Sequence, residues 1–187
     1  IDEILDVADG LMVARGDLGV ELPPEDVPIV QKMLVKKAKR RRKVSIVATH
    51  MLDSMCNNPT PTRAEVSDVA NAVLDGTDAV MLSGETTMGK FPAETVTHMA
   101  NICENAEKHV DFEGVFASSR EINVTETIAT SVVESANMLN ASLIVAATMS
   151  GYSARKISNL KPNSFILATC PTPSVARGLA LNWGVYS

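Results

Sequence analysis

Three short groups of polar residues and glycines each follow directly on an apolar run of the sequence. The groups are Arg15, Gly16 and Asp17 after residues 11–14, Thr49 and His50 after residues 44–48, and Ser83, Gly84 and Glu85 after residues 79–82. If the runs are neighbouring parallel strands, their C-terminal ends share one face of the sheet, where the active sites of α/β proteins lie. Together the groups predict a metal-assisted site for an anionic substrate.

The first two groups carry the main chemistry of this hypothesis. Asp17 offers a hard oxygen of the kind that Mg²⁺ prefers, and the backbone N–H groups around Gly16 suit a carboxylate. Thr49 could donate a hydrogen bond to the same anion. Gly16 and Gly19 would permit a positive φ and a close approach of the ligand to the backbone. On spacing alone, a tight surface turn at Arg15 explains these residues equally well.

Glu85 and His50 each allow two interpretations. Glu85 follows a tight Ser-Gly turn, so it is either a base behind the site or an acid in the first turn of a helix. His50 invites an acid or base role, because an unperturbed imidazole changes charge near neutral pH. However, a single histidine without an identified partner is more often a hydrogen-bonded structural residue.

The elements that must position these groups form a repeat. The three apolar runs start about 33 residues apart, with helical periodicity between them, which is typical of a βα repeat in a parallel sheet or (β/α)₈ barrel. Residues 23–26, Pro-Pro-Glu-Asp, would start the first of these helices, and the basic residues 36–43 would occupy its last turns. Read alone, the basic run could also be a localisation signal or a phosphate-binding patch.

A second region with a shorter repeat follows. A helix with capping-box spacing begins at Asn123, and the next apolar runs, at residues 143–147 and 165–168, start about 22 residues apart. The shorter repeat favours an open α/β sheet. We therefore expect an α/β protein with three parts, namely part of a (β/α)₈ TIM barrel in residues 1–110, a linker in residues 111–123 and an open-sheet α/β domain in residues 124–187.

Composition limits the class of protein. The chain is 45% hydrophobic and 21% charged, and no apolar stretch approaches the about 18 residues of a membrane span. A net charge of -5 argues against general nucleic-acid binding. Cys56, Cys103 and Cys170 are widely spaced and lack paired ligands, so they resemble neither a disulfide framework nor a zinc site. A reducing cytoplasm is the simplest expectation.

Four ordered motifs resemble the pyruvate kinase family. They are residues 12–19 (MVARGDLG), 48–55 (ATHMLDSM), 61–72 (PTRAEVSDVANA) and 78–86 (DAVMLSGET). The resemblance covers essentially the whole chain and is densest up to about residue 109. It implies the last βα units of a catalytic barrel, followed by most of a C-terminal regulatory domain.

The resemblance assigns roles to the residues at the strand ends. It implies that Asp17 is a ligand of the catalytic Mg²⁺ or Mn²⁺, that Gly16 and Asp17 contact the substrate carboxylate through their backbone, and that Thr49 lies beside it. The family's reaction transfers a phosphoryl group from phosphoenolpyruvate to ADP in glycolysis, usually with K⁺, and leaves an enolate that is then protonated. Ser83 and Glu85 match polar residues near the site, where proton delivery is one role open to them.

Further implications concern regulation and assembly. Arg63 matches an arginine at a subunit contact, and full-length members of the family are usually homotetramers. The residues Thr148, Ser150, Gly151, Tyr152 and Ser153 resemble a loop that grips a sugar-phosphate effector, and other members respond to a nucleotide effector or to none. An ordinary βα turn capped by Ser153 explains this loop equally well.

The sequence departs from the family pattern in two respects. His50 stands where the family usually has glutamine, which puts the local hydrogen bonds in question. The family's catalytic lysine, its metal-binding glutamate, its K⁺ ligands and its nucleotide contacts would all precede Ile1. We therefore expect the chain to be an inactive part of a longer enzyme. The alternatives are a non-catalytic effector-binding or oligomerisation module and another Mg²⁺-dependent barrel enzyme acting on a small keto acid.

Overall fold

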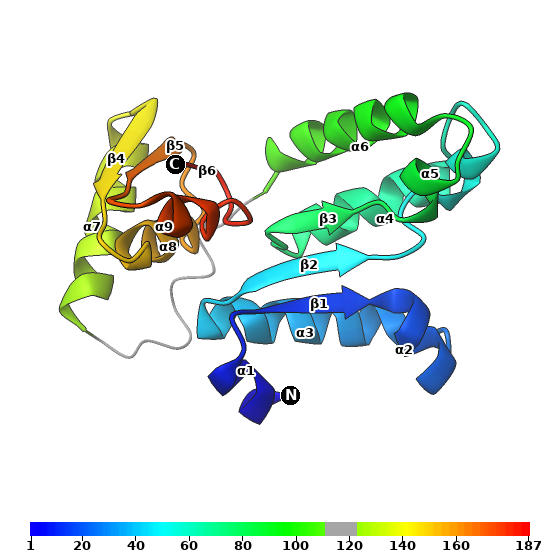
Figure 1. Cartoon of the computed structure of the whole chain (residues 1–187), viewed down its shortest axis with the longest axis horizontal. Helices are drawn as coiled ribbons and strands as arrows, with labels where there is room; N and C mark the ends of the chain where they lie inside the picture. Colours follow the sequence, from blue (N-terminus) through cyan, green and yellow to red (C-terminus); the bar gives the residue numbers. More distant parts are fainter. Residues whose placement is uncertain (111–122) are drawn as a thin grey trace. The chain divides into compact units, whose positions relative to one another are not determined.

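The computed structural model describes residues 1–110 and 123–187. They belong to two compact units, residues 1–110 and residues 111–187. Each unit is built on its own parallel sheet (Figure 1). The linker expected at residues 111–123 lies, except for Asn123, outside the described residues.

The first unit contains a three-stranded parallel sheet in the order β1, β2, β3. The strands are β1 (Gly10–Ala14), β2 (Val44–Ala48) and β3 (Ala79–Met81). All three arrowheads point to the same end of the sheet in Figure 1, and α2 (Arg15–Glu21) and α5 (Gly84–Thr87) lie at that end. The predicted βα repeat, with its shared C-terminal face, is confirmed.

The longer helices of the first unit are α3 (Val27–Arg41), α4 (Arg63–Leu74) and α6 (Pro92–Glu107), and further short ones are α1 (Asp2–Val7) and the 3₁₀ helix η1 (Asp53–Cys56). Helices α3 and α4 pack against the strands of this sheet, and α6 packs against α4. Strands, helices and the loop after β2 share a single core, formed by Val13, Leu34, Val35, Val47, Met51, Leu52, Met55, Val69, Ala72 and Met99. The buried side chains of Met51, Leu52 and Met55 fix the path of that loop, which begins with the candidate site residue Thr49.

The helix α3 starts later than the sequence indicates. Residues 23–26 form a turn, the helix begins at Val27, and its first turn contains no acidic residue. Pro28 rather than Pro24 therefore occupies the favourable position at the start of the helix. The basic residues do end the helix as predicted, and two of them, Lys37 and Arg41, form ion pairs with Asp2 of α1.

The strand β1 is buried on one face only. Val13 is 1% exposed, whereas its neighbour Met12 is 45% exposed. An apolar run such as residues 11–14 favours a strand buried on both faces, whereas within the described residues the side of the sheet that carries Met12 is open. Within these residues the three strands form an open sheet and do not close into a barrel.

The second unit is also a three-stranded parallel sheet, in the order β4, β5, β6. Its elements are α7 (Val124–Met138), β4 (Leu143–Ala147), α8 (Tyr152–Ser158), β5 (Phe165–Thr169), α9 (Pro173–Arg177) and β6 (Val185–Tyr186). Side chains alternate strictly along β4 and β5 between buried and exposed. Ile144 and Ile166 face the core with Val133 and Leu179, while Phe165 on the opposite face is 59% exposed.

The predicted elements of this unit are present with shifted boundaries. The sequence pattern also predicts a helix from about Ser174 to Leu181, whereas α9 begins at Pro173 and ends at Arg177. At the start of α7, Asn123 accepts a hydrogen bond from the Glu126 N–H at 3.0 Å, but the Glu126 carboxylate pairs with Lys156 at 3.0 Å. In the described residues, no helix is both long and apolar enough to cross a membrane.

Candidate functional site

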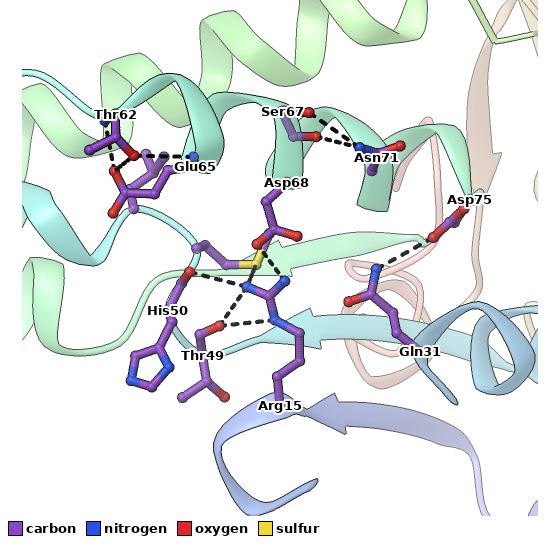
Figure 2. Close-up of polar contacts among 12 residues, drawn as sticks. Arg15, Gln31, Thr49, His50, Thr62, Glu65, Ser67, Asp68, Asn71 and Asp75 are labelled. Carbon is purple, nitrogen blue, oxygen red and sulfur yellow. Dashed lines mark hydrogen bonds and ion pairs between the residues drawn. The ribbon is translucent and has the colours of Figure 1, made fainter. Parts of the chain in front are cut away.

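The C-terminal ends of β1 and β2 are joined by the side chain of Arg15. Arg15 is the first residue of α2, and its guanidinium points toward the loop that follows β2 (Figure 2). Nε and Nη2 donate to the carbonyl of Thr49 at 3.1 and 2.7 Å, and Nη2 also donates to the carbonyl of His50 at 3.2 Å. Nη1 forms an ion pair with Asp68 of α4 at 2.5 Å. One side chain thus connects two strand ends and a helix.

The loop that Arg15 contacts has an unusual backbone. Thr49 and His50 have φ values of +77° and +53°, in the left-handed region. Such values are uncommon outside glycine and are a true outlier for a β-branched residue such as Thr49. Each costs on the order of 1–3 kcal/mol and persists only where the surroundings hold it. Here the guanidinium holds the two carbonyls, and the fully buried Met51 and Leu52 anchor the residues that follow.

Gly16 is needed for space, not for backbone freedom. A Cβ at this position would lie 3.1 Å from Cγ2 of Thr49. The first turn of α2 and the loop after β2 are therefore in close contact, as the hypothesis of one site requires. The positive φ that Gly16 and Gly19 would permit is not used, because both residues belong to the regular helix α2. The alternative of a tight surface turn is excluded for the same reason.

Asp17 is the third residue of α2, and its side chain is exposed. Across residues 1–110 and 123–187 it has no ion pair or hydrogen-bonded side-chain partner. The first N–H groups of a helix also lack an acceptor within it, so Gly16 and Asp17 present backbone donors at the same place. This combination suits an anion and a hard cation together.

The structure also limits what the chain can do with a metal ion. Within the described parts of the chain, no three His, Cys, Asp or Glu side chains converge on one point. Asp17 can therefore contribute one carboxylate ligand, but the described residues do not add two further ligands of these types beside it. The donor set fits Mg²⁺ or Mn²⁺ in chemistry but is incomplete.

Glu85 occupies a buried structural position. Its side chain is 2% exposed, and its two oxygens accept hydrogen bonds from the N–H groups of Leu52 at 3.2 Å and Ser83 at 2.7 Å. It lies in the first turn of α5, in agreement with the second of its two predicted interpretations. The carboxylate links the end of β3 to the loop after β2. Ser83 is the N-cap residue of α5, and its hydroxyl does not cap the helix.

Glu65 makes a comparable link from α4. Its carboxylate accepts hydrogen bonds from the N–H and hydroxyl of Ser54, at 2.7 and 2.6 Å, and from the N–H and hydroxyl of Thr62, at 2.7 and 2.8 Å. Burial raises the pKa of Glu65, but the hydrogen bonds from Ser54 and Thr62 outweigh it and hold that pKa below its usual value. The neighbouring Arg63 is exposed.

Sequence reasoning missed the supporting roles of Asp68 and Glu65. Both lie in a motif that we recognised, but nothing in their spacing connects Asp68 to Arg15, which is 53 residues away. For Glu65 a signal did exist, since Thr62 and Glu65 have the spacing of a capping box, which the structure contains. His50 is placed beside Thr49 as expected, but its side chain is exposed and its carbonyl makes the contact with Arg15.

The second candidate site is the loop between β4 and α8. Gly151 has a φ of +82°, and the N–H of Thr148 donates to the carbonyl of Thr169 at 3.1 Å. Ser150 is exposed, and its carbonyl accepts a hydrogen bond from Arg155 at 2.7 Å. The helix begins at Tyr152 with Gly151 as its N-cap, so Ser153 does not cap it, although the alternative of an ordinary turn required this cap.

Two family models match separate parts of the chain. The model described as "Pyruvate kinase, barrel domain" matches residues 1–96, and the one described as "Pyruvate kinase, alpha/beta domain" matches residues 126–187. The two matches fall in the two units described above.

Similar full-length proteins carry the same description. Pyruvate kinase from Staphylococcus haemolyticus is 53% identical over 189 residues, which cover 100% of this chain and 32% of that protein. Pyruvate kinase from Geobacillus stearothermophilus is 50% identical over 190 residues, with shares of 100% and 32%. A crystal structure of a pyruvate kinase from Cryptosporidium parvum superimposes with a TM-score of 0.95 at 46% identity and covers 99% of this chain and 38% of that one. The chain thus spans about a third of the length of these relatives.

Proposed function

Since this chain belongs to the pyruvate kinase family, we propose that it supplies part of the active site of an enzyme that transfers a phosphoryl group from phosphoenolpyruvate to ADP. The observation that carries the proposal is the contact between the first turn of α2 and Thr49. It brings the three residues with the required chemistry, Gly16, Asp17 and Thr49, to one end of the sheet.

Each of these residues has a distinct role in the proposal. The N–H groups of Gly16 and Asp17 and the hydroxyl of Thr49 bind the carboxylate of phosphoenolpyruvate and orient it. The carboxylate of Asp17 holds Mg²⁺ or Mn²⁺, which when bound neutralises charge on the phosphoryl oxygens. Phosphoryl transfer depends mainly on positioning and charge neutralisation, so these parts are the ones expected. K⁺ would be held by residues outside this chain.

Ser83 and Glu85 have a supporting part in this proposal. Both oxygens of Glu85 are engaged by backbone N–H groups, so its contribution is to fix the loops around the site. The hydroxyl of Ser83 is the better candidate for proton delivery to the enolate. This follows because Ser83 is partly exposed and its hydroxyl is not used as a helix cap.

The parent enzyme is proposed to be a cytoplasmic homotetramer in glycolysis. Arg63, exposed at the start of α4, is the candidate for a subunit contact. The loop of residues 148–153 is the candidate for a sugar-phosphate or nucleotide effector, because the left-handed Gly151 shapes it as an anion nest. Calorimetry with sugar phosphates tests the loop, since binding should be lost on Ser150→Asp.

The proposed activity is tested with a chimaeric enzyme. These 187 residues replace the matching segment of the Geobacillus stearothermophilus pyruvate kinase, and pyruvate formation from phosphoenolpyruvate and ADP is measured. We expect the chimaera to be active and the isolated 187-residue chain to be inactive. A folded but inactive chimaera would refute the proposal. Turnover by the isolated chain would refute the statement that the chain supplies only part of the active site.

A further inference from the structure

The guanidinium of Arg15 serves the protein itself and not a ligand. Its side chain is 11% exposed, and each of its three nitrogens has a protein acceptor. Nη2 also lies 2.9 Å from the sulfur of Met51, in addition to its contacts with the carbonyls of Thr49 and His50. A cation engaged in this way is poorly placed to neutralise a substrate phosphate, although it lies next to residues proposed to bind the substrate.

The contacts of Arg15 coincide with the strained backbone. The two carbonyls that it binds belong to Thr49 and His50, the two consecutive residues with left-handed φ values. In this conformation the side chain of Thr49 lies against Gly16. A relaxed loop would move the hydroxyl of Thr49 away from the N–H groups at the start of α2, so the strain and the site geometry depend on each other.

Asp68 completes the arrangement from a third element. It lies on α4, pairs with Nη1 of Arg15 and leaves the other two nitrogens directed at the loop. The planar guanidinium can serve three acceptors at fixed angles, which the compact ammonium of a lysine cannot do. Figure 2 shows Asp68 and the loop carbonyls on different sides of the guanidinium.

We infer that Arg15, oriented by Asp68, is a positioning residue that holds Thr49 in its left-handed conformation and thereby sets the affinity for the substrate carboxylate. This inference rests on the proposed function for the role of Thr49 but on the structure for the role of Arg15. Because the carboxylate is bound in the ground state and the transition state alike, loss of the contact should raise KM more than it lowers kcat.

The chimaeric enzyme described above allows two measurements on Arg15→Lys. In kinetics, KM for phosphoenolpyruvate should rise about tenfold or more, as expected for one lost hydrogen bond to a charged group, with kcat and KM for ADP within about threefold. Asp68→Asn should likewise raise KM for phosphoenolpyruvate while kcat and KM for ADP change little. In hydrogen exchange, the amides of residues 49–51 should exchange faster while those of β2 stay protected. Arg41→Lys, at the end of α3, is the matched control and should change neither measurement.

A double mutant separates positioning from general damage. If Arg15 acts through Thr49, the variant that combines Arg15→Lys with Thr49→Ala should have the same KM for phosphoenolpyruvate as Thr49→Ala alone, within about twofold. Multiplying effects, or unchanged exchange at residues 49–51, would overturn the inference. If the unsubstituted chimaera is folded but inactive, the proposed function fails, and hydrogen exchange alone then decides whether Arg15 holds the loop.

Discussion

Two carboxylates near the same end of the sheet have opposite surroundings. Asp17 is exposed and has no side-chain partner in the described residues, whereas Glu85 is 2% exposed and accepts two backbone hydrogen bonds. The first environment leaves the carboxylate oxygens available to a cation. The second uses both oxygens to hold the chain, so residue type alone does not distinguish a ligand from a structural acid.

The environment of Glu85 leads to a prediction about stability. Glu85→Gln should lower the free energy of unfolding by about 1–3 kcal/mol. In the unsubstituted protein both carboxylate oxygens accept from backbone N–H groups. In the variant the amide NH₂, a donor, would face one of these N–H groups and leave it without an acceptor. Urea unfolding measures the change. Glu94→Gln, an exposed acid in the first turn of α6, is the control and should have little effect. Equal effects of the two substitutions would contradict the structural role of Glu85.

At the scale of elements, side chains from the first two turns of α4 hold the loop after β2 in place. Glu65 binds Ser54 of η1, and Asp68 binds Arg15 of α2. Spacing predicts the helix, but these tertiary partners depend on how the loop folds back. That path is set by the buried side chains of Met51, Leu52 and Met55, which a pattern of apolar residues does not reveal.

The hydrogen bonds to Glu65 predict a pH dependence of stability. The pKa of Glu65 is lowered in the folded protein, so the unfolded chain takes up a proton at a higher pH than the folded one. This contribution is present at neutral pH and is lost as the pH falls from about 4.5 through the folded pKa. Glu65→Gln should therefore reduce the acid sensitivity of unfolding measured between about pH 5 and pH 3. An unchanged pH profile would contradict this account.

At the scale of the whole molecule, the two units share an architecture but have separate cores. The second core predicts that Leu179→Ala, at a side chain that is 0% exposed, lowers the free energy of unfolding by about 2–5 kcal/mol. Leu181→Ala is a matched control because Leu181 is 53% exposed. Urea unfolding followed by circular dichroism compares them, and similar losses for both would contradict the assignment of this core.

Much of this fold could be predicted from the sequence. The apolar runs identify β1, β2 and β4 closely, and the strand ends identify the candidate site at Gly16, Asp17 and Thr49. The burial of β1 could not be predicted, because an apolar run looks the same whether one face or both are covered. The left-handed backbone at Thr49 could not be predicted either, because it depends on Arg15 and Asp68, which only the tertiary fold brings together.

The measurement that tests the central claim most directly is the activity of the chimaeric enzyme with Asp17→Ala. We expect kcat/KM for pyruvate formation to fall by about 10²- to 10³-fold or more, as for the loss of one strong electrostatic contact. The control is Asp26→Ala, which removes an exposed aspartate whose side chain does not cap α3, and it should leave the rate unchanged. A near-normal rate for Asp17→Ala would contradict its assignment as a metal ligand and, with it, the site proposed at the end of β1.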